Sequence, residues 1–197
     1  MVTLSTIKKA LNALIVINEK YELPSWENNM LQQLLKDIPI HSLTFICIPS
    51  NATTRKSVAY RLFRKFEQRW FRSLPDAFAT INVKSQYPEA SFISSANKDS
   101  PPNNFCYISC LVNVKYQADA EPAYGTWFFE FGTGNYRNAK PPAFWEVMKD
   151  DPVTGSSLLA RFPETNNTVT VYNGVTTSVP YSVKNNLNSI AWKSASY

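Results

Sequence analysis

The segment with the most distinctive chemistry runs from Tyr124 to Phe144. An aromatic strand carries one carboxylate, Glu130, and ends in Gly132-Thr133-Gly134. Two glycines at a strand end allow a tight turn that other residues rarely adopt. A carboxylate in such a strand needs a partner when it is buried, and we expect Thr133, nearby backbone N–H groups or Arg137 to provide it. The pattern predicts a structural turn beside a satisfied Glu130. A phosphate-binding loop is disfavoured because no Lys-Ser or Lys-Thr pair follows the glycines.

Histidine and cysteine, the usual residues of acid–base, nucleophilic and zinc chemistry, are scarce. The chain has one histidine, His41, and three cysteines. Cys106 and Cys110 are four residues apart in an expected strand, about 13 Å along it, which is too far for a disulfide. A catalytic pair of Cys47 and His41 is disfavoured, because Cys47 lies in an apolar strand, where its thiol is unreactive. We expect three buried free thiols and a reducing compartment.

Paired carboxylates also give no convincing catalytic site. Asp119 and Glu121, and Asp150 and Asp151, are neighbours in expected loops. Acid–base catalysis needs carboxyl groups that converge on one cleft with different pKa values, whereas loop neighbours are usually solvated. We therefore expect a protein that is not an enzyme and has no catalytic residues, metal site or cofactor.

The positive charge of the chain is concentrated between residues 54 and 74. The net charge of the whole chain is +5. This segment has one acidic residue, Glu67, and seven basic ones: Arg55, Lys56, Arg61, Arg64, Lys65, Arg69 and Arg72. Such a helix is typical of contact with nucleic acid or an acidic partner. A solvated face whose long side chains cover apolar surface is the alternative.

The elements that position these residues follow from hydrophobic periodicity. A spacing of 3.6 predicts a helix over about 4–20, a second from Ser25 to Ile38 and a third over 54–74. The apolar stripe of the third helix includes Leu62, Phe63, Phe66, Trp70 and Leu74. Leu43 to Ile48 reads as a buried strand, and Pro141 to Met148 as a short helix. The expected later strands are 77–84, 90–95, 106–116 and 125–131.

Thr168 to Tyr172, Asn173-Gly174 and Val175 to Val183 predict a hairpin, because Asn-Gly suits a type I′ turn. Helices first and strands afterwards favour an α+β fold, with N-terminal helices followed by a mainly antiparallel β-sheet. We expect residues 1–183 to form a single domain and residues 184–197 a polar C-terminal arm.

The Glu-Phe-Gly-Thr segment and the later proline-rich element carry a family resemblance. The stretch Phe129-Glu130-Phe131-Gly132-Thr133-Gly134, followed by Pro141-Pro142-Ala143-Phe144, resembles the signature of tail-completion, or head–tail neck, proteins of long-tailed bacteriophages. The chain departs from that family in lacking an Arg-Thr-Gly segment after its long helix. The resemblance implies an α+β subunit that forms a ring at the portal–tail junction and has no enzymatic activity.

This resemblance predicts a virion structural protein of the tail or neck, assembled in the host cytoplasm as a homo-oligomeric ring. Its partners would be neighbouring portal, neck or tail proteins, with non-specific DNA contact through the basic helix and no membrane contact. The alternative is a nucleic-acid-binding accessory protein, with Arg61, Arg64 and Arg69 on the phosphates and Trp70 or Phe71 stacking on bases. A coat protein of a small virus is a third interpretation.

Overall fold

The computed structural model describes residues 11–48, 58–71, 73–94, 105–109, 124–137, 139–162 and 167–196, with only the backbone given at 58–60, 68, 105–109 and 135. The strands are β1 (Leu11–Asn18), β2 (Glu22–Pro24), β3 (Ile40–Ile48), β4 (Thr80–Asn82), β5 (Ser91–Ser94), β6 (Phe105–Ser109), β7 (Thr126–Phe131), β8 (Val153–Phe162) and β9 (Asn167–Thr177). The helices are α1 (Ser25–Asp37), α2 (Val58–Trp70), α3 (Val83–Gln86), α4 (Phe144–Met148) and α5 (Val183–Ser194), with a 3-10 turn η1 (Gly134–Tyr136).

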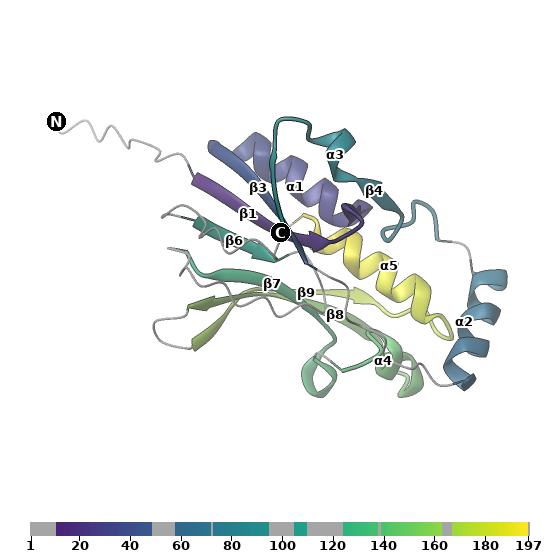
Figure 1. The fold of residues 1–197 in the computed structure, drawn as a ribbon. Coiled ribbons are helices and arrows are strands. Elements are labelled where there is room, and N and C mark those ends of the chain that lie inside the picture. Colours follow the sequence, from purple (N-terminus) through teal and green to yellow (C-terminus); the bar gives the residue numbers. More distant parts are fainter. Residues whose placement is uncertain are drawn as a thin grey trace.

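The main sheet has seven described strands in the order β5-β3-β1-β6-β7-β8-β9 (Figure 1). Neighbours from β5 to β7 are parallel, whereas β8 is antiparallel to both β7 and β9. β2 and β4 form a separate antiparallel pair. The α+β class expected from the sequence is confirmed, and a parallel portion that was not expected accompanies the antiparallel one.

The first described element is a strand, so the prediction of a helix over 4–20 is wrong for the part that the structure describes. β1 lies between β3 and β6, and Ala13 to Ile17 are all at most 2% exposed. A strand covered on both faces reads as a continuous apolar run. The sequence Ala13-Leu14-Ile15-Val16-Ile17 is such a run, and three of its members are β-branched, which favours strand over helix.

Several other elements lie close to where the sequence placed them. α1, β3, α2, β5, β7 and α4 overlap the predicted helices and strands. Ser25 is the first residue of α1, and its Oγ donates to the carbonyl of Ala79 at 2.8 Å. The strand expected over 77–84 is shorter and continues into α3. β6 covers the start of the 106–116 prediction, and residues 110–116, Cys110 included, lie outside the described residues.

The predicted hairpin at Asn173-Gly174 is wrong, because both residues lie inside the long strand β9. Asn173 pairs with Ser157 and Gly174 with Ser156 on β8. The antiparallel pair is formed by β8, which periodicity did not predict, and β9. Asn-Gly favours a turn only where no partner strand competes for the backbone hydrogen bonds.

The polar arm expected from Lys184 is instead the helix α5, which packs on the sheet beside α1 (Figure 1). Ile190 and Ala191 are fully buried. They share one core cluster with Trp26 of α1 and with Phe129 and Phe131 of β7. The ring of Trp26 meets both phenylalanines edge-on, at centroid distances of 5.2 and 5.8 Å.

Candidate functional site at helix α2

Helix α2 contacts the rest of the molecule through one face. The ring of Phe63 meets Phe144 edge-on at 6.2 Å. It packs on the cluster of Ala143, Val147 and Val183, which joins α4 to the start of α5. Beyond the helix, Ser73 Oγ donates to Asn185 Oδ1. α2 is therefore attached mainly to the N-terminal end of α5 (Figure 1).

Glu67, the lone acid of α2 in the sequence, makes the central contact of this attachment. It is only 3% exposed, and its Oε1 accepts the backbone N–H of Lys184 at 2.9 Å. The first N–H groups of a helix lack partners within the helix, and its N-terminus favours negative charge. Ser182 Oγ accepts a second N–H, that of Asn185, at 3.1 Å. Glu67 thus has a structural role as a cap of α5.

The apolar stripe of α2 is largely exposed. Leu62, Phe66 and Trp70 are 63%, 55% and 68% exposed. They are four residues apart, which places them on one face of the helix. Phe66 and Trp70 contact each other, with ring centroids 6.0 Å apart. The apolar stripe predicted from periodicity exists, but of its members on α2 only Phe63 packs against the rest of the molecule.

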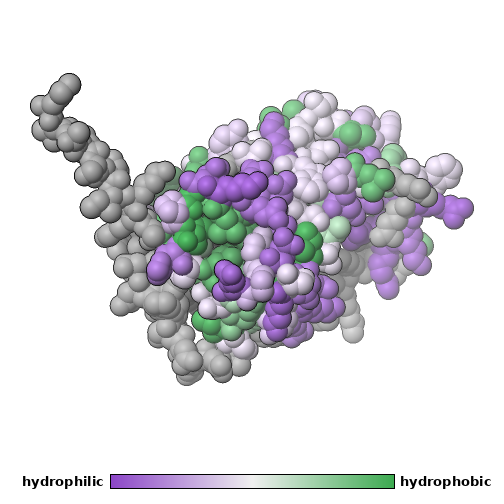
Figure 2. Space-filling model, turned by 90° about the horizontal axis from the view of Figure 1, so that it is seen from above, coloured by the Kyte–Doolittle hydropathy of each residue, from purple (hydrophilic) through white to green (hydrophobic). Residues whose placement is uncertain are grey.

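A basic surface borders this stripe. Arg61, Arg64, Lys65 and Arg69 are all exposed, and no ion pair is formed by any of them within the described residues. Figure 2 shows hydrophilic side chains beside hydrophobic ones at the end of the molecule where α2 lies in Figure 1. Arg55, Lys56 and Arg72, which the sequence assigned to the same helix, lie outside the described residues.

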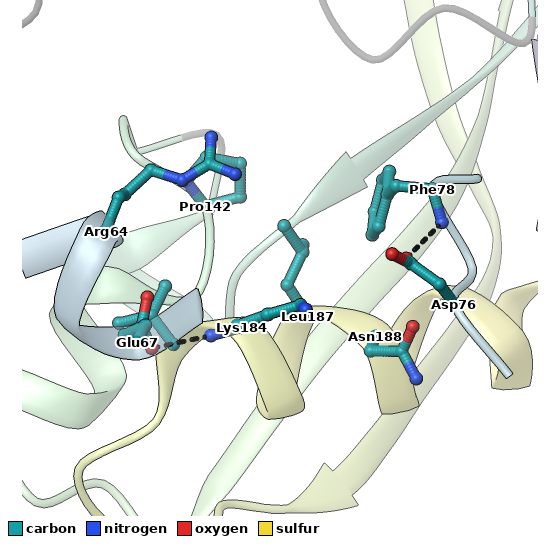
Figure 3. Close-up of a pocket in the computed structure, with 9 residues that line it drawn as sticks. Arg64, Glu67, Asp76, Phe78, Pro142, Lys184, Leu187 and Asn188 are labelled. Atoms are coloured by element: carbon teal, nitrogen blue, oxygen red, sulfur yellow. Dashed lines mark hydrogen bonds between the residues drawn. The ribbon is translucent and has the colours of Figure 1, made fainter. Parts of the chain in front are cut away.

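A pocket of about 290 Å³ opens between α2 and α5 (Figure 3). We call it the α2–α5 pocket. Its lining residues come from both helices, from the segment after α2 and from the loop before α4: Arg64, Glu67, Asp76, Phe78, Pro142, Val183, Lys184, Leu187 and Asn188. Asn188 is a positioning residue, because its Oδ1 accepts Ala77 N at 2.7 Å and its Nδ2 donates to Pro75 O at 3.2 Å. The pocket therefore has fixed walls and mixed charge. Sequence reasoning identified Arg64 and Glu67 but not the residues that α5 brings to them.

The Gly132-Thr133-Gly134 segment forms a tight turn after β7. Gly132 has a φ of +118°, and a Cβ there would lie 2.1 Å from the carbonyl oxygen of Tyr136. The backbone N–H of Thr133 donates to Glu146 Oε1 at 3.3 Å. Glu146 is 1% exposed, and burial raises the pKa of its carboxyl group.

Glu130, the acid that the sequence placed in this role, is half-buried. No hydrogen bond or ion pair joins it to Thr133 or Arg137 in the part of the chain that the structure describes. The expected partnership is therefore not formed. The acid that accepts from the turn is Glu146, from α4.

The remaining chemical candidates are far apart. His41 is exposed at the start of β3 and Cys47 is buried near its end, about 20 Å apart at the rise of a strand. Burial raises the pKa of the Cys47 thiol, which disfavours the reactive thiolate. Among the described residues no group of three or more His, Cys, Asp or Glu side chains is arranged to hold a metal ion. None of the described helices has the length and apolar character needed to span a membrane.

Comparisons with known proteins give no family for this chain. No protein-family model matches it, and no curated protein matches it. A solved structure of a formyltetrahydrofolate deformylase from Pseudomonas putida KT2440 is similar in fold, with 9% identity and a TM-score of 0.47. The match covers 96% of this chain and 64% of that protein, so the chain spans less than two thirds of its length. A likeness of this degree carries no argument about activity.

The expectation of a phage head–tail connector or tail-completion subunit is corrected by these findings. No protein-family model matches the chain, so the resemblance to tail-completion proteins has no support. The order of helices before strands that periodicity predicted is also not observed, because the described part of the chain begins with β1 and ends with α5. The short Glu-Phe-Gly-Thr match coincides with a strand end that needs glycine at Gly132.

Proposed function

We propose that the protein works by binding, and that α2 attaches it to the surface of an anionic phospholipid membrane. The observation that carries this proposal is the exposure of Leu62, Phe66 and Trp70 beside Arg61, Lys65 and Arg69 on one helix. Helices that lie in a membrane interface combine an apolar face rich in Trp, Phe and Leu with a polar face rich in Lys and Arg. Both halves of that pattern are present in α2.

Phospholipid accounts for both chemistries of the surface. Arginine forms paired hydrogen bonds with phosphate. Trp is favoured at the level of lipid headgroups, and Phe and Leu suit the apolar face of an interfacial helix. The phosphates of a nucleic acid would pair with the cations and its bases could stack on Trp70, but it has no apolar interior that would bury the side chain of Leu62. A second copy of this chain would bring the same cations to the interface, which repel one another.

The way α2 is held supports a surface role. Phe63 and Glu67 fix the helix to α4 and α5 through the face next to the stripe. The apolar stripe is thus displayed on a preformed helix, and binding does not require folding of the segment. Preorganisation of this kind lowers the entropic cost of association.

The test is sedimentation of the protein with vesicles of phosphatidylcholine alone or with phosphatidylglycerol. We expect binding to the anionic vesicles that weakens with added salt. The double variant Phe66→Ala/Trp70→Ala should bind at least about tenfold more weakly, because each ring loses its burial in the interface. The triple variant Arg61→Gln/Lys65→Gln/Arg69→Gln should lose the preference for anionic lipid.

The matched control is Val169→Ala/Val171→Ala, which removes exposed apolar side chains from β9 instead. It should bind vesicles like the wild type. Retention of vesicle binding by the folded Phe66→Ala/Trp70→Ala variant would contradict the proposal. So would binding to duplex DNA, RNA or an acidic peptide with no binding to anionic vesicles.

A further inference from the structure

The α2–α5 pocket presents free charges of both signs. On its basic side are Arg64 from α2 and Lys184 from α5. The backbone N–H of Lys184 is occupied by Glu67, but its ammonium group forms no ion pair within the described residues, and neither does the Arg64 guanidinium. Two cations, one from each helix, therefore line the pocket without an ion-pair partner among the described residues.

The acidic side of the pocket is formed by Asp76. Its Oδ1 accepts the backbone N–H of Phe78 at 3.0 Å, which fixes the carboxylate. Its second oxygen forms no hydrogen bond or ion pair within the described residues. Figure 3 shows Arg64 and Asp76 approaching from opposite sides, with Lys184 and Leu187 between them. The other acid, Glu67, is already engaged with the α5 backbone. Asp76 and Arg64 therefore lie on opposite sides of the pocket.

The remaining walls are apolar. Phe78, Pro142, Val183 and Leu187 line the pocket with the charged residues. At about 290 Å³, its volume is at the lower end of the roughly 300–1,000 Å³ of sites for drug-sized ligands. The occupant is therefore a small molecule with one apolar group.

We propose that the α2–α5 pocket binds a zwitterion of the amino-acid type with an apolar side chain. Its carboxylate pairs with Arg64 and Lys184, its ammonium group with Asp76, and its side chain contacts Phe78 and Leu187. A simple anion would face Asp76, and a simple cation would face Arg64 and Lys184, so each would leave one charge of the pocket unpaired. This site goes beyond the membrane function and does not depend on it.

The test is isothermal titration calorimetry with L-leucine, L-methionine and L-phenylalanine as probes. The matched analogues of leucine are isoamylamine, which lacks the carboxylate, and 4-methylpentanoate, which lacks the amine. We expect at least one of the three amino acids to bind. If leucine binds, its affinity should be at least about tenfold higher than that of either analogue, because each analogue loses a charged hydrogen bond.

Variants assign the roles within the pocket. Asp76→Asn should weaken amino-acid binding at least about tenfold, but not binding of the analogue without the amine, since the Asn carbonyl keeps the bond to Phe78 N–H. Lys184→Met should weaken binding of both. Lys65→Met removes a cation of α2 that is not part of the pocket lining and should change neither. Vesicle binding should persist in Asp76→Asn, which separates this site from the α2 surface.

Several results would overturn the proposal. One is the absence of binding by all three amino acids at millimolar concentration to the folded protein. Another is binding that is equal for the amino acid and its analogues, or that is unchanged in both Asp76→Asn and Lys184→Met. Inorganic phosphate binding as tightly as the amino acid would also contradict it, because the pocket would then be a site for anions.

Discussion

Glu27 is the most isolated charge-bearing side chain in the described core. It lies in the first turn of α1, is 1% exposed, and its Oε2 has no hydrogen-bond partner. Burial raises the pKa of this carboxyl group well above 4.5. The folded protein therefore holds the proton at pH values where the unfolded chain has released it. The free energy of unfolding must then fall as pH rises from about 4.5 toward the folded pKa.

This effect predicts a pH-dependent difference between the wild type and Glu27→Gln. The variant cannot ionise at this position, so its free energy of unfolding should increase relative to the wild type as pH rises from 4.5. Urea unfolding between pH 4 and pH 8 measures the difference. Glu19→Gln, at an exposed position, is the control and should show little pH dependence. A difference for Glu27→Gln that is constant with pH would contradict the assignment.

The conformation of single residues could be predicted from the sequence where local backbone geometry determines it. The Gly132-Thr133-Gly134 turn follows from the backbone freedom of glycine, which is a local property. Its acid partner did not follow, because Glu146 reaches Thr133 only after the chain has folded back through α4. Likewise, the sequence showed that Trp70 is on the apolar stripe of α2, but not that this stripe is exposed.

At the scale of elements, α2 depends on α5. Glu67→Ala should remove the bond to Lys184 N–H and destabilise the attachment by about 1–2 kcal/mol, as the loss of a helix cap does. We expect faster hydrogen exchange in α2 and in the first turn of α5, with exchange in the buried strand β1 unchanged. Glu67→Gln keeps an oxygen acceptor and is the control. Equal protection of α2 in Glu67→Ala and the wild type would show that Glu67 does not hold the helix.

Two elements, β1 and α5, were predicted wrongly from the sequence, and each error has a physical reason. β1 was read as a helix because apolar residues on both faces of a central strand also match helical spacing. α5 was read as a polar arm because of its asparagines. Asn186 bonds both backbone groups of Val179, at 2.6 and 3.1 Å, and Asn188 holds Ala77 and Pro75. Polar residues that bind backbone inside the fold cannot be told from solvated ones by composition.

At the scale of the whole molecule, α5 joins parts that are far apart in sequence. It packs with α1 and β7 in one core cluster, caps its N-terminus with a residue of α2, and forms one wall of the α2–α5 pocket. A chain of this size stabilises itself largely through such burial. The C-terminal helix is therefore required for the fold and for both proposed binding sites.

Substitutions in α5 distinguish a packed helix from the polar arm that the sequence suggested. Ile190→Ala should lower the free energy of unfolding by about 2–5 kcal/mol, because it leaves a cavity among Trp26, Phe129 and Leu158. Leu62→Ala deletes an exposed side chain of equal size from α2 and should change the free energy by less than about 0.5 kcal/mol. Chemical denaturation measures both values. An arm would tolerate either change, so similarly small losses of stability in the two variants would restore the interpretation of a polar arm. A large loss of unfolding free energy in Ile190→Ala alone establishes α5 as part of the core.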